Sequence, residues 1–94
     1  AAAFNSNIGT WTISSTTNMS YMFAGASDFN QNIGGWNTSS VNTIEGMFHN
    51  ATSFNQNIGN WNTREVTNME GMFRGASSFN QTLNSWAMGH TFTV

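Results

Sequence analysis

Aromatic and polar residues return every 25 positions along this chain, and this period constrains the fold more than any other feature. Each unit opens with Phe-Asn and continues to a Trp, and each of the first three units carries Met-Phe in its second half. A fixed period of this size is the signature of stacked structural units that bury their apolar sides on one another. The sequence therefore predicts a single domain over residues 1–94, about four turns long, with an incomplete last unit. The units begin near Phe4, Phe29, Phe54 and Phe79.

The first part of each unit has the alternating pattern of a β-strand. In residues 29–33 apolar and polar side chains alternate, so Phe29, Gln31 and Ile33 would share the inner side. The Gln residues of successive units would then form an inward column whose amides bond to one another. The alternative is a shorter strand from which these side chains point outward. Stacked units would place such strands side by side in a parallel sheet.

The second part of each unit has the spacing of a short helix. After the capping residues 37–40, apolar side chains follow at positions that share one helical face. In the second unit these are Val41, Ile44, Met47, Phe48 and Ala51. Gly46 lies inside this segment and lowers its helix propensity, which favours two turns that are partly 3₁₀. The predicted fold class is therefore an α/β repeat, with a parallel sheet on one side and short helices on the other.

Charged side chains make up only 6% of the chain, against about 25% in ordinary soluble domains. There is no Lys, so no basic patch could neutralise several phosphates, and we expect neither nucleic acid nor a membrane surface as partner. No apolar run approaches the roughly 20 residues of a membrane-spanning helix, which predicts no membrane insertion. The absence of Cys excludes disulfides and thiolate metal sites.

The titratable residues form no recognisable catalytic set. His49 and His90 lie far apart in sequence, and we expect them at the surface or at the end of the fold. Glu70 precedes Arg74 by one helical turn, the favourable order for a solvated ion pair. No glycine-rich phosphate loop, nucleophile elbow or pair of catalytic acids occurs. We therefore expect no enzymatic activity, no catalytic or metal-binding residues and no cofactor.

The unit from Phe54 to Ser78 carries the strings Phe-Asn-Gln-Asn-Ile-Gly-x-Trp-Asn-Thr and Val-Thr-Asn-Met-x-x-Met-Phe-x-Gly-Ala-Ser. Both resemble the short repeats of bacterial surface proteins related to leucine-rich repeats, known as the BspA-like or mycoplasma-lipoprotein type. The resemblance covers nearly the whole chain. It implies a right-handed, leucine-rich-repeat-like solenoid that is displayed at the cell surface or outside the cell, with roles in adhesion or host attachment.

One departure from the resembled pattern concerns Asn. Members of the resembled group often carry Asp where this chain has Asn32 and Asn57 in the strand, and Asn37 and Asn62 after Trp. Stacked Asp carboxylates would repel one another, whereas Asn can hydrogen-bond to its copy in the next unit. Neutral amides are also poor sole ligands for Ca²⁺. The substitution favours tight stacking over calcium binding.

Outward-facing Asn residues are the candidate ligand-binding face. A regular surface of amides could hold a glycan, ice or a host matrix protein, and the alternative is that it only keeps the sheet hydrated without charge. The candidate residues are Asn5, Asn30, Asn55 and Asn80 in one column and Asn7, Asn32 and Asn57 in another.

Neither end of the chain carries a polar cap of the kind that repeat proteins use. The last unit also departs from the pattern in residues 88–94, where apolar and polar residues alternate as in a strand or an extended arm. We therefore expect a structural or adhesive module whose copies associate end to end into a fibre or surface array. The candidate assembly residues are Ala1, Phe4, Phe92 and Val94. The competing explanation is a piece of a longer array that contacts its neighbouring repeats.

Overall fold

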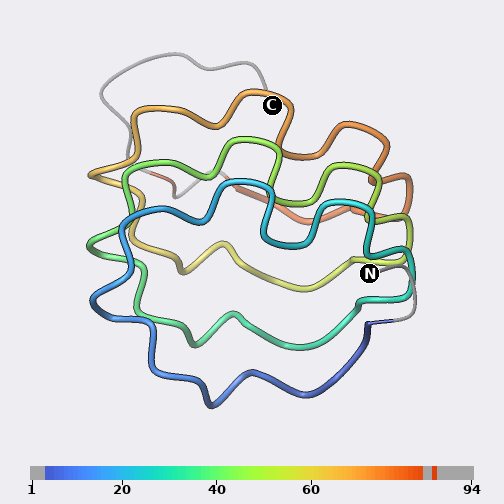
Figure 1. The fold of residues 1–94 in the computed structure, drawn as a ribbon, viewed down its shortest axis with the longest axis horizontal. Coiled ribbons are helices and arrows are strands. Elements are labelled where there is room, and N and C mark those ends of the chain that lie inside the picture. The colour runs from blue at the N-terminus through green and yellow to red at the C-terminus, as the bar shows by residue number, and fades with distance from the viewer. Residues whose placement is uncertain (1–3, 84–85, 87–94) are drawn as a thin grey trace.

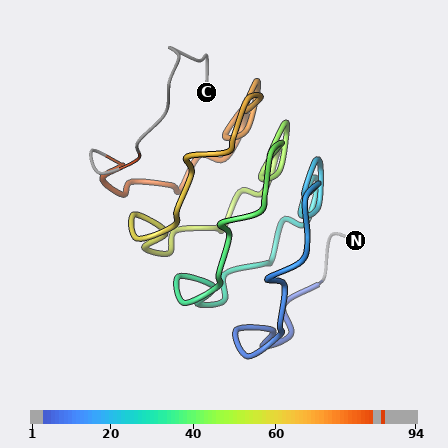
Figure 2. The ribbon, with the colours of Figure 1, turned by 90° about the vertical axis from the view of Figure 1, so that its left-hand side faces the viewer.

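A computed structural model describes residues 4–83 and 86, and in this part the chain winds in successive, similar turns (Figure 1). We call these turns coil 1 (residues 4–28), coil 2 (29–53), coil 3 (54–78) and coil 4 (79–83 and 86). The side view shows the coils lying on one another in chain order (Figure 2). Coil 2 therefore has a neighbour on each side, whereas coil 1 has a coil on one side only.

The predicted α/β solenoid with a parallel sheet and short helices is wrong. Residues 4–83 and 86 contain no helix and no strand, and the backbone consists of turns and irregular segments. Only two isolated parallel bridges occur in this part, joining Asn18 to Thr43 and Thr43 to Asn68. The description as a leucine-rich-repeat-like solenoid is wrong for the same reason, because the described coils consist of turns and contain neither the strand nor the helix of such a unit.

The segment predicted as a helix uses its amide groups in a different way. Every second N–H from Ile44 to Asn50 donates to a carbonyl of coil 3, at 2.7–3.0 Å. The N–H groups of Met47, His49 and Ala51 close tight turns by donating three residues back, at 2.9–3.1 Å. An α-helix would need all of these donors for bonds four residues back along its own axis. The amides therefore hold neighbouring coils together instead of forming a helix.

Left-handed residues are the local cause of this geometry. Two positions in each of coils 1, 2 and 3 have a positive φ, which interrupts a right-handed helix. In coil 2 they are Gly46 (φ 57°) and Asn50 (φ 59°). The same positions are Tyr21 and Gly25 in coil 1, and Gly71 and Gly75 in coil 3. The apolar residues whose spacing predicted a helix are therefore carried by a series of tight turns. The residues with positive φ change the direction of the backbone between these turns.

The segment predicted as a strand is joined to the neighbouring coil by side-chain hydrogen bonds and not by the backbone hydrogen bonds of a parallel sheet. The N–H of Asn30 donates to Oδ1 of Asn5 at 2.9 Å, and Asn55 and Asn80 bond in the same way to the preceding Asn. A carboxamide thus stands where a parallel sheet would have a backbone carbonyl. Gln31 Nε2 also donates to the Asn5 oxygens, at 2.9 and 3.0 Å. The Gln residues therefore bond to the Asn column and not to one another.

The core consists of the apolar residues that recur with the period. Phe rings stack in pairs, with centroids 4.1 Å apart for Phe23 and Phe29 and 4.0 Å apart for Phe48 and Phe54. Each later Trp donates its indole N–H to an Ile carbonyl of the preceding coil: Trp36 to Ile8 at 3.1 Å, and Trp61 to Ile33 at 3.0 Å. Because every buried indole finds an acceptor, the Trp column fixes the register of the coils.

Candidate functional site

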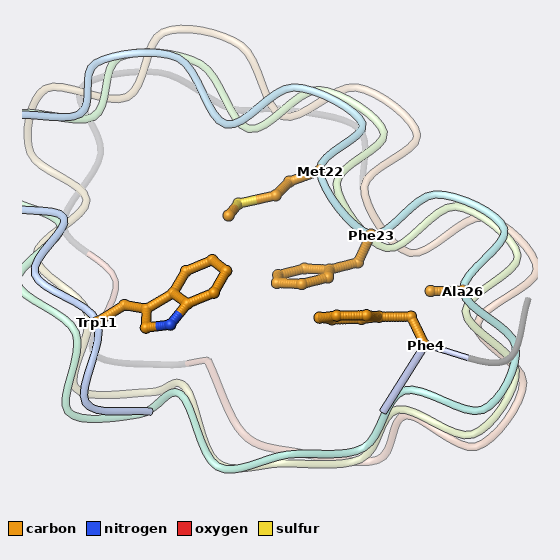
Figure 3. A pocket seen from close by; sticks show the side chains of 5 residues that line it. All are labelled: Phe4, Trp11, Met22, Phe23 and Ala26. Atoms are coloured by element: carbon orange, nitrogen blue, oxygen red, sulfur yellow. The ribbon is translucent and has the colours of Figure 1, made fainter. Parts of the chain in front are cut away.

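The side of coil 1 that faces away from coil 2 carries the largest exposed apolar side chain of the described residues. Trp11 is 53% exposed, whereas Trp36 is 4% and Trp61 is 3% exposed. A cavity of about 270 Å³ lies beside it. Figure 3 shows the Trp11 indole on one side of this hollow and the stacked rings of Phe4 and Phe23 on the other. We call this surface the first-coil face; it is lined by Phe4, Trp11, Met22, Phe23 and Ala26.

The first-coil face is a core surface without its neighbouring coil. Met22 is 39% exposed, but Met47 at the same position in coil 2 is fully buried. The indoles of Trp36 and Trp61 stack with centroids 6.3 Å apart, whereas the described ring contacts include none between Trp11 and Trp36. No described residue accepts the indole N–H of Trp11. The same residue types are therefore buried or exposed according to whether a preceding coil covers them.

The backbone of the first-coil face also has unused acceptors. Within the described part of the chain, no N–H donates to the carbonyls of Asn18, Ser20, Met22 and Ala24. Their counterparts in coil 2 accept bonds of 2.7–3.0 Å from the N–H groups of coil 1. The face therefore presents one indole donor and a row of carbonyl acceptors around an apolar hollow.

The described part of coil 4 presents the complementary groups. We call it the last-coil face, formed by Phe79, Asn80, Leu83 and Trp86. In coil 3 the corresponding Ile58 carbonyl accepts the indole N–H of Trp86 at 3.1 Å, and Asn55 Oδ1 accepts the N–H of Asn80 at 2.9 Å. Among the described residues, only the backbone N–H of Trp86 donates to the Leu83 carbonyl, and none donates to Asn80 Oδ1. Coil 4 thus offers an acceptor for an indole and an acceptor for a backbone amide.

The predicted Asn face is exposed, but most of its oxygens are engaged. Oδ1 of Asn5, Asn30 and Asn55 accepts both a backbone N–H and a Gln Nε2 from the next coil, at 2.9–3.0 Å. Oδ1 of each Asn in the second column accepts the N–H of the Gly two residues ahead, at 2.9–3.1 Å. These are Asn7, Asn32 and Asn57. Both columns therefore build the coils, and they offer a ligand mainly amide N–H donors.

Of the predicted assembly residues, only Phe4 lies within the described part, where it is half-buried in the first-coil face. Ala1, Phe92 and Val94 lie outside the described residues, as do His90 and the whole segment 88–94. The sequence interpretation missed Trp11 and Met22, because the period assigns both to the core. The period gives the same signal for every Trp and every Met of its columns, so it does not single out Trp11 or Met22.

Neither a cluster of metal-ligating side chains nor a membrane-spanning helix is found in residues 4–83 and 86. No group of three or more His, Asp or Glu side chains there is arranged to hold a metal ion. No helix of sufficient length and hydropathy to cross a membrane is found in the same residues. The expected ion pair between Glu70 and Arg74 is also not formed, because the segment that carries them is not helical.

Comparison with known proteins gives one family. The family described as "Mycoplasma protein of unknown function, DUF285" matches residues 1–93. The chain gives no match among curated proteins and none among solved structures. This family is related to the BspA-like mycoplasma repeats, so the resemblance seen in the sequence is confirmed at that level. Neither the family nor the structure supports the expected roles in adhesion and in forming a filament.

Proposed function

We propose that this chain, which belongs to the Mycoplasma family of unknown function described above, is a non-enzymatic module whose copies bind one another. The contact joins the first-coil face of one copy to the last-coil face of another. One observation carries the proposal: Trp11 is 53% exposed and no described residue accepts its indole N–H, while each later Trp is buried and donates to a carbonyl.

The contact repeats interactions that already join the coils within one chain. The Leu83 carbonyl of one copy accepts the indole N–H of Trp11 of the other, as the Ile8 carbonyl does for Trp36. Asn80 Oδ1 accepts the N–H of Asn5, as Asn55 Oδ1 does for Asn80. Phe4 lies on Phe79 as Phe79 lies on Phe54, with ring centroids 5.9 Å apart. Each donor on the first-coil face therefore meets an acceptor on the last-coil face.

The two faces differ, so the two copies are related head to tail and not by a two-fold axis. An aromatic side chain buries about 150–250 Å². The contact, which rests on Phe4, Trp11 and Met22, is thus smaller than a standard interface of about 1,200–2,000 Å². We expect a dissociation constant of about 10 μM or weaker, because a small interface must also offset the entropy of association.

Two further parts of the proposal come from the resemblance. The 25-residue units are repeats of the BspA-like kind, and the protein acts outside the cell or at its surface. The alternative, a binding face for a glycan, a host matrix protein or ice along the Asn columns, has less support. It would have to use amides whose oxygens already bond within the coils.

The test is sedimentation velocity over a wide range of protein concentration. The wild-type chain should sediment faster as its concentration rises through the high micromolar range. Trp11→Lys places a charge on the first-coil face and should abolish this dependence. Thr12→Lys is the matched control, because Thr12 is the exposed neighbour of Trp11 in sequence and lines no part of the face. A wild-type chain that stays monomeric, or equal behaviour of the two variants, would contradict the proposal.

A further inference from the structure

A second surface lies on the edge where the turns of three coils meet. Tyr21 of coil 1, Glu45 and His49 of coil 2, and Glu70 and Arg74 of coil 3 line a cavity of about 170 Å³. The chain has only four acidic and two basic residues, and half of these six surround this cavity. We call it the edge groove. It shares no residue with the first-coil face or the last-coil face.

Two glycines make the floor of the edge groove. Gly46 and Gly71 both have positive φ, 57° and 65°, a conformation that side-chain-bearing residues rarely adopt. A Cβ added at Gly46 would collide with the Tyr21 ring, so this ring lies directly against the Gly46 backbone. A Cβ added at Gly71 would have nothing within 4 Å. The space above Gly71 is therefore open, whereas the Tyr21 ring fills the space above Gly46.

One wall of the groove is held in place by hydrogen bonds. The Tyr21 side chain hydrogen-bonds to Glu45, and this bond, reinforced by the negative charge of Glu45, raises the pKa of the Tyr21 phenol. Asn68 Nδ2 donates to the same carboxylate at 3.3 Å. Tyr21 is nevertheless 53% exposed, so its ring is both oriented and accessible. Such pre-orientation lowers the entropic cost of binding a ligand.

The groove is also lined by polar side chains that no described residue engages. No described residue forms a hydrogen bond or ion pair with the side chains of His49, Glu70 or Arg74. Together they present a carboxylate that accepts hydrogen bonds, a guanidinium that donates several, and an imidazole that can donate or accept. The groove thus combines an oriented aromatic ring with unengaged donors and acceptors.

We propose that the edge groove binds a single neutral sugar ring. Sugar hydroxyls both donate and accept, so they match a wall that mixes carboxylate and guanidinium, and an apolar sugar face can lie on the Tyr21 ring. Glu45 with Glu70 disfavours an anion, and the Arg74 guanidinium offsets part of the attraction of these carboxylates for a cation. Pockets for drug-sized ligands measure about 300–1,000 Å³. A cavity of about 170 Å³ is therefore suited to one ring and not to a larger ligand.

The test is two-dimensional NMR of the full chain titrated with methyl glycosides of glucose, galactose, mannose and N-acetylglucosamine. At least one of these probes should shift the signals of Gly46, His49 and Gly71 in a saturable way. Equal titrations with spermidine and with sulfate should not. If none of the four sugars shifts these signals, if the shifts fall on the Asn columns, or if either charged probe binds the groove more tightly, the proposal is overturned.

Two variants show whether the binding depends on the groove. Tyr21→Gly removes the ring and supplies the residue that coils 2 and 3 already carry at this position, so folding should be retained. It should weaken sugar binding at least tenfold. Arg64→Ala, which removes an exposed cation outside the groove, should leave binding unchanged. Trp11→Lys should also bind sugar as the wild type does, so failure of self-association and failure of sugar binding are separate outcomes. Wild-type affinity in Tyr21→Gly would refute the assignment.

Discussion

Coil 1 and coil 2 have nearly the same pattern of apolar residues, but these residues are in different environments. Phe29, Trp36 and Met47 of coil 2 are at most 4% exposed, because coil 1 covers them. Trp11 and Met22 occupy the equivalent positions of coil 1 and are 53% and 39% exposed. The comparison shows that these Trp and Met positions are buried only where a preceding coil covers them, whereas Ile8, Met19 and Phe23 of coil 1 are buried without one.

The largest expected effect contrasts the two Trp positions. Trp36→Ala should lower the free energy of unfolding by about 3–5 kcal/mol, because it opens a cavity and removes the bond to the Ile8 carbonyl. Trp11→Ala should lower it by less than about 1 kcal/mol in the monomer, because this side chain is more than half exposed. Urea unfolding at low micromolar concentration measures both values. Similar losses of unfolding free energy at Trp11 and Trp36 would contradict this contrast, because they would show that Trp11 is as well covered as Trp36.

A smaller effect separates the left-handed glycines of coils 2 and 3. Gly46→Ala should cost about 2–3 kcal/mol, because the new methyl group adds a collision with the Tyr21 ring to the backbone strain. Gly71→Ala should cost about 1–2 kcal/mol, from strain alone. In a Tyr21→Gly background the two costs should become equal. Chemical denaturation of Gly46→Ala, Tyr21→Gly and the double variant measures this coupling. If the unfolding free energies of the two single variants simply add in the double variant, the contact between residues 21 and 46 is excluded.

The smallest effect concerns the phenol of Tyr21, the only Tyr of the chain. Its hydrogen bond to Glu45 raises its pKa in the folded state above the ordinary value of 10.0. Because the folded pKa is the higher one, this contribution to stability is complete below pH 10 and is lost as pH rises through the folded pKa. Ultraviolet titration of the phenolate should show a lower midpoint in Glu45→Gln. An unchanged midpoint would exclude the bond.

The sequence predicts the core better than it predicts the backbone. Val41, Ile44, Met47, Phe48 and Ala51 are all buried, as their spacing indicates, yet they lie in turns and not in a helix. Gly46 indicates left-handed geometry at one position of this segment, but Asn50, and Tyr21 in coil 1, adopt the same geometry without being Gly. Local propensity cannot anticipate this, because bonds to the neighbouring coil stabilise it.

The role of Asn was also only partly predictable. The period places Asn5, Asn30 and Asn55 in one exposed column, which the structure contains. It does not reveal that each carboxamide replaces a backbone carbonyl between coils, so a strand was expected where none forms. The edge groove could not be predicted at all, since Tyr21, Glu45 and Arg74 are brought together only by the stacking of three coils.

The most direct test of the central claim, that the first-coil face binds the last-coil face of another copy, is a mixing experiment by sedimentation velocity. Trp11→Lys blocks the first face and Asn80→Lys blocks the second, and both residues are exposed, so both variants should fold. Each variant alone should remain monomeric at concentrations where the wild type associates. Mixed in equal amounts, they should form a one-to-one complex through the one intact pair of faces. A mixture that stays monomeric, or either variant associating alone, would contradict the head-to-tail contact.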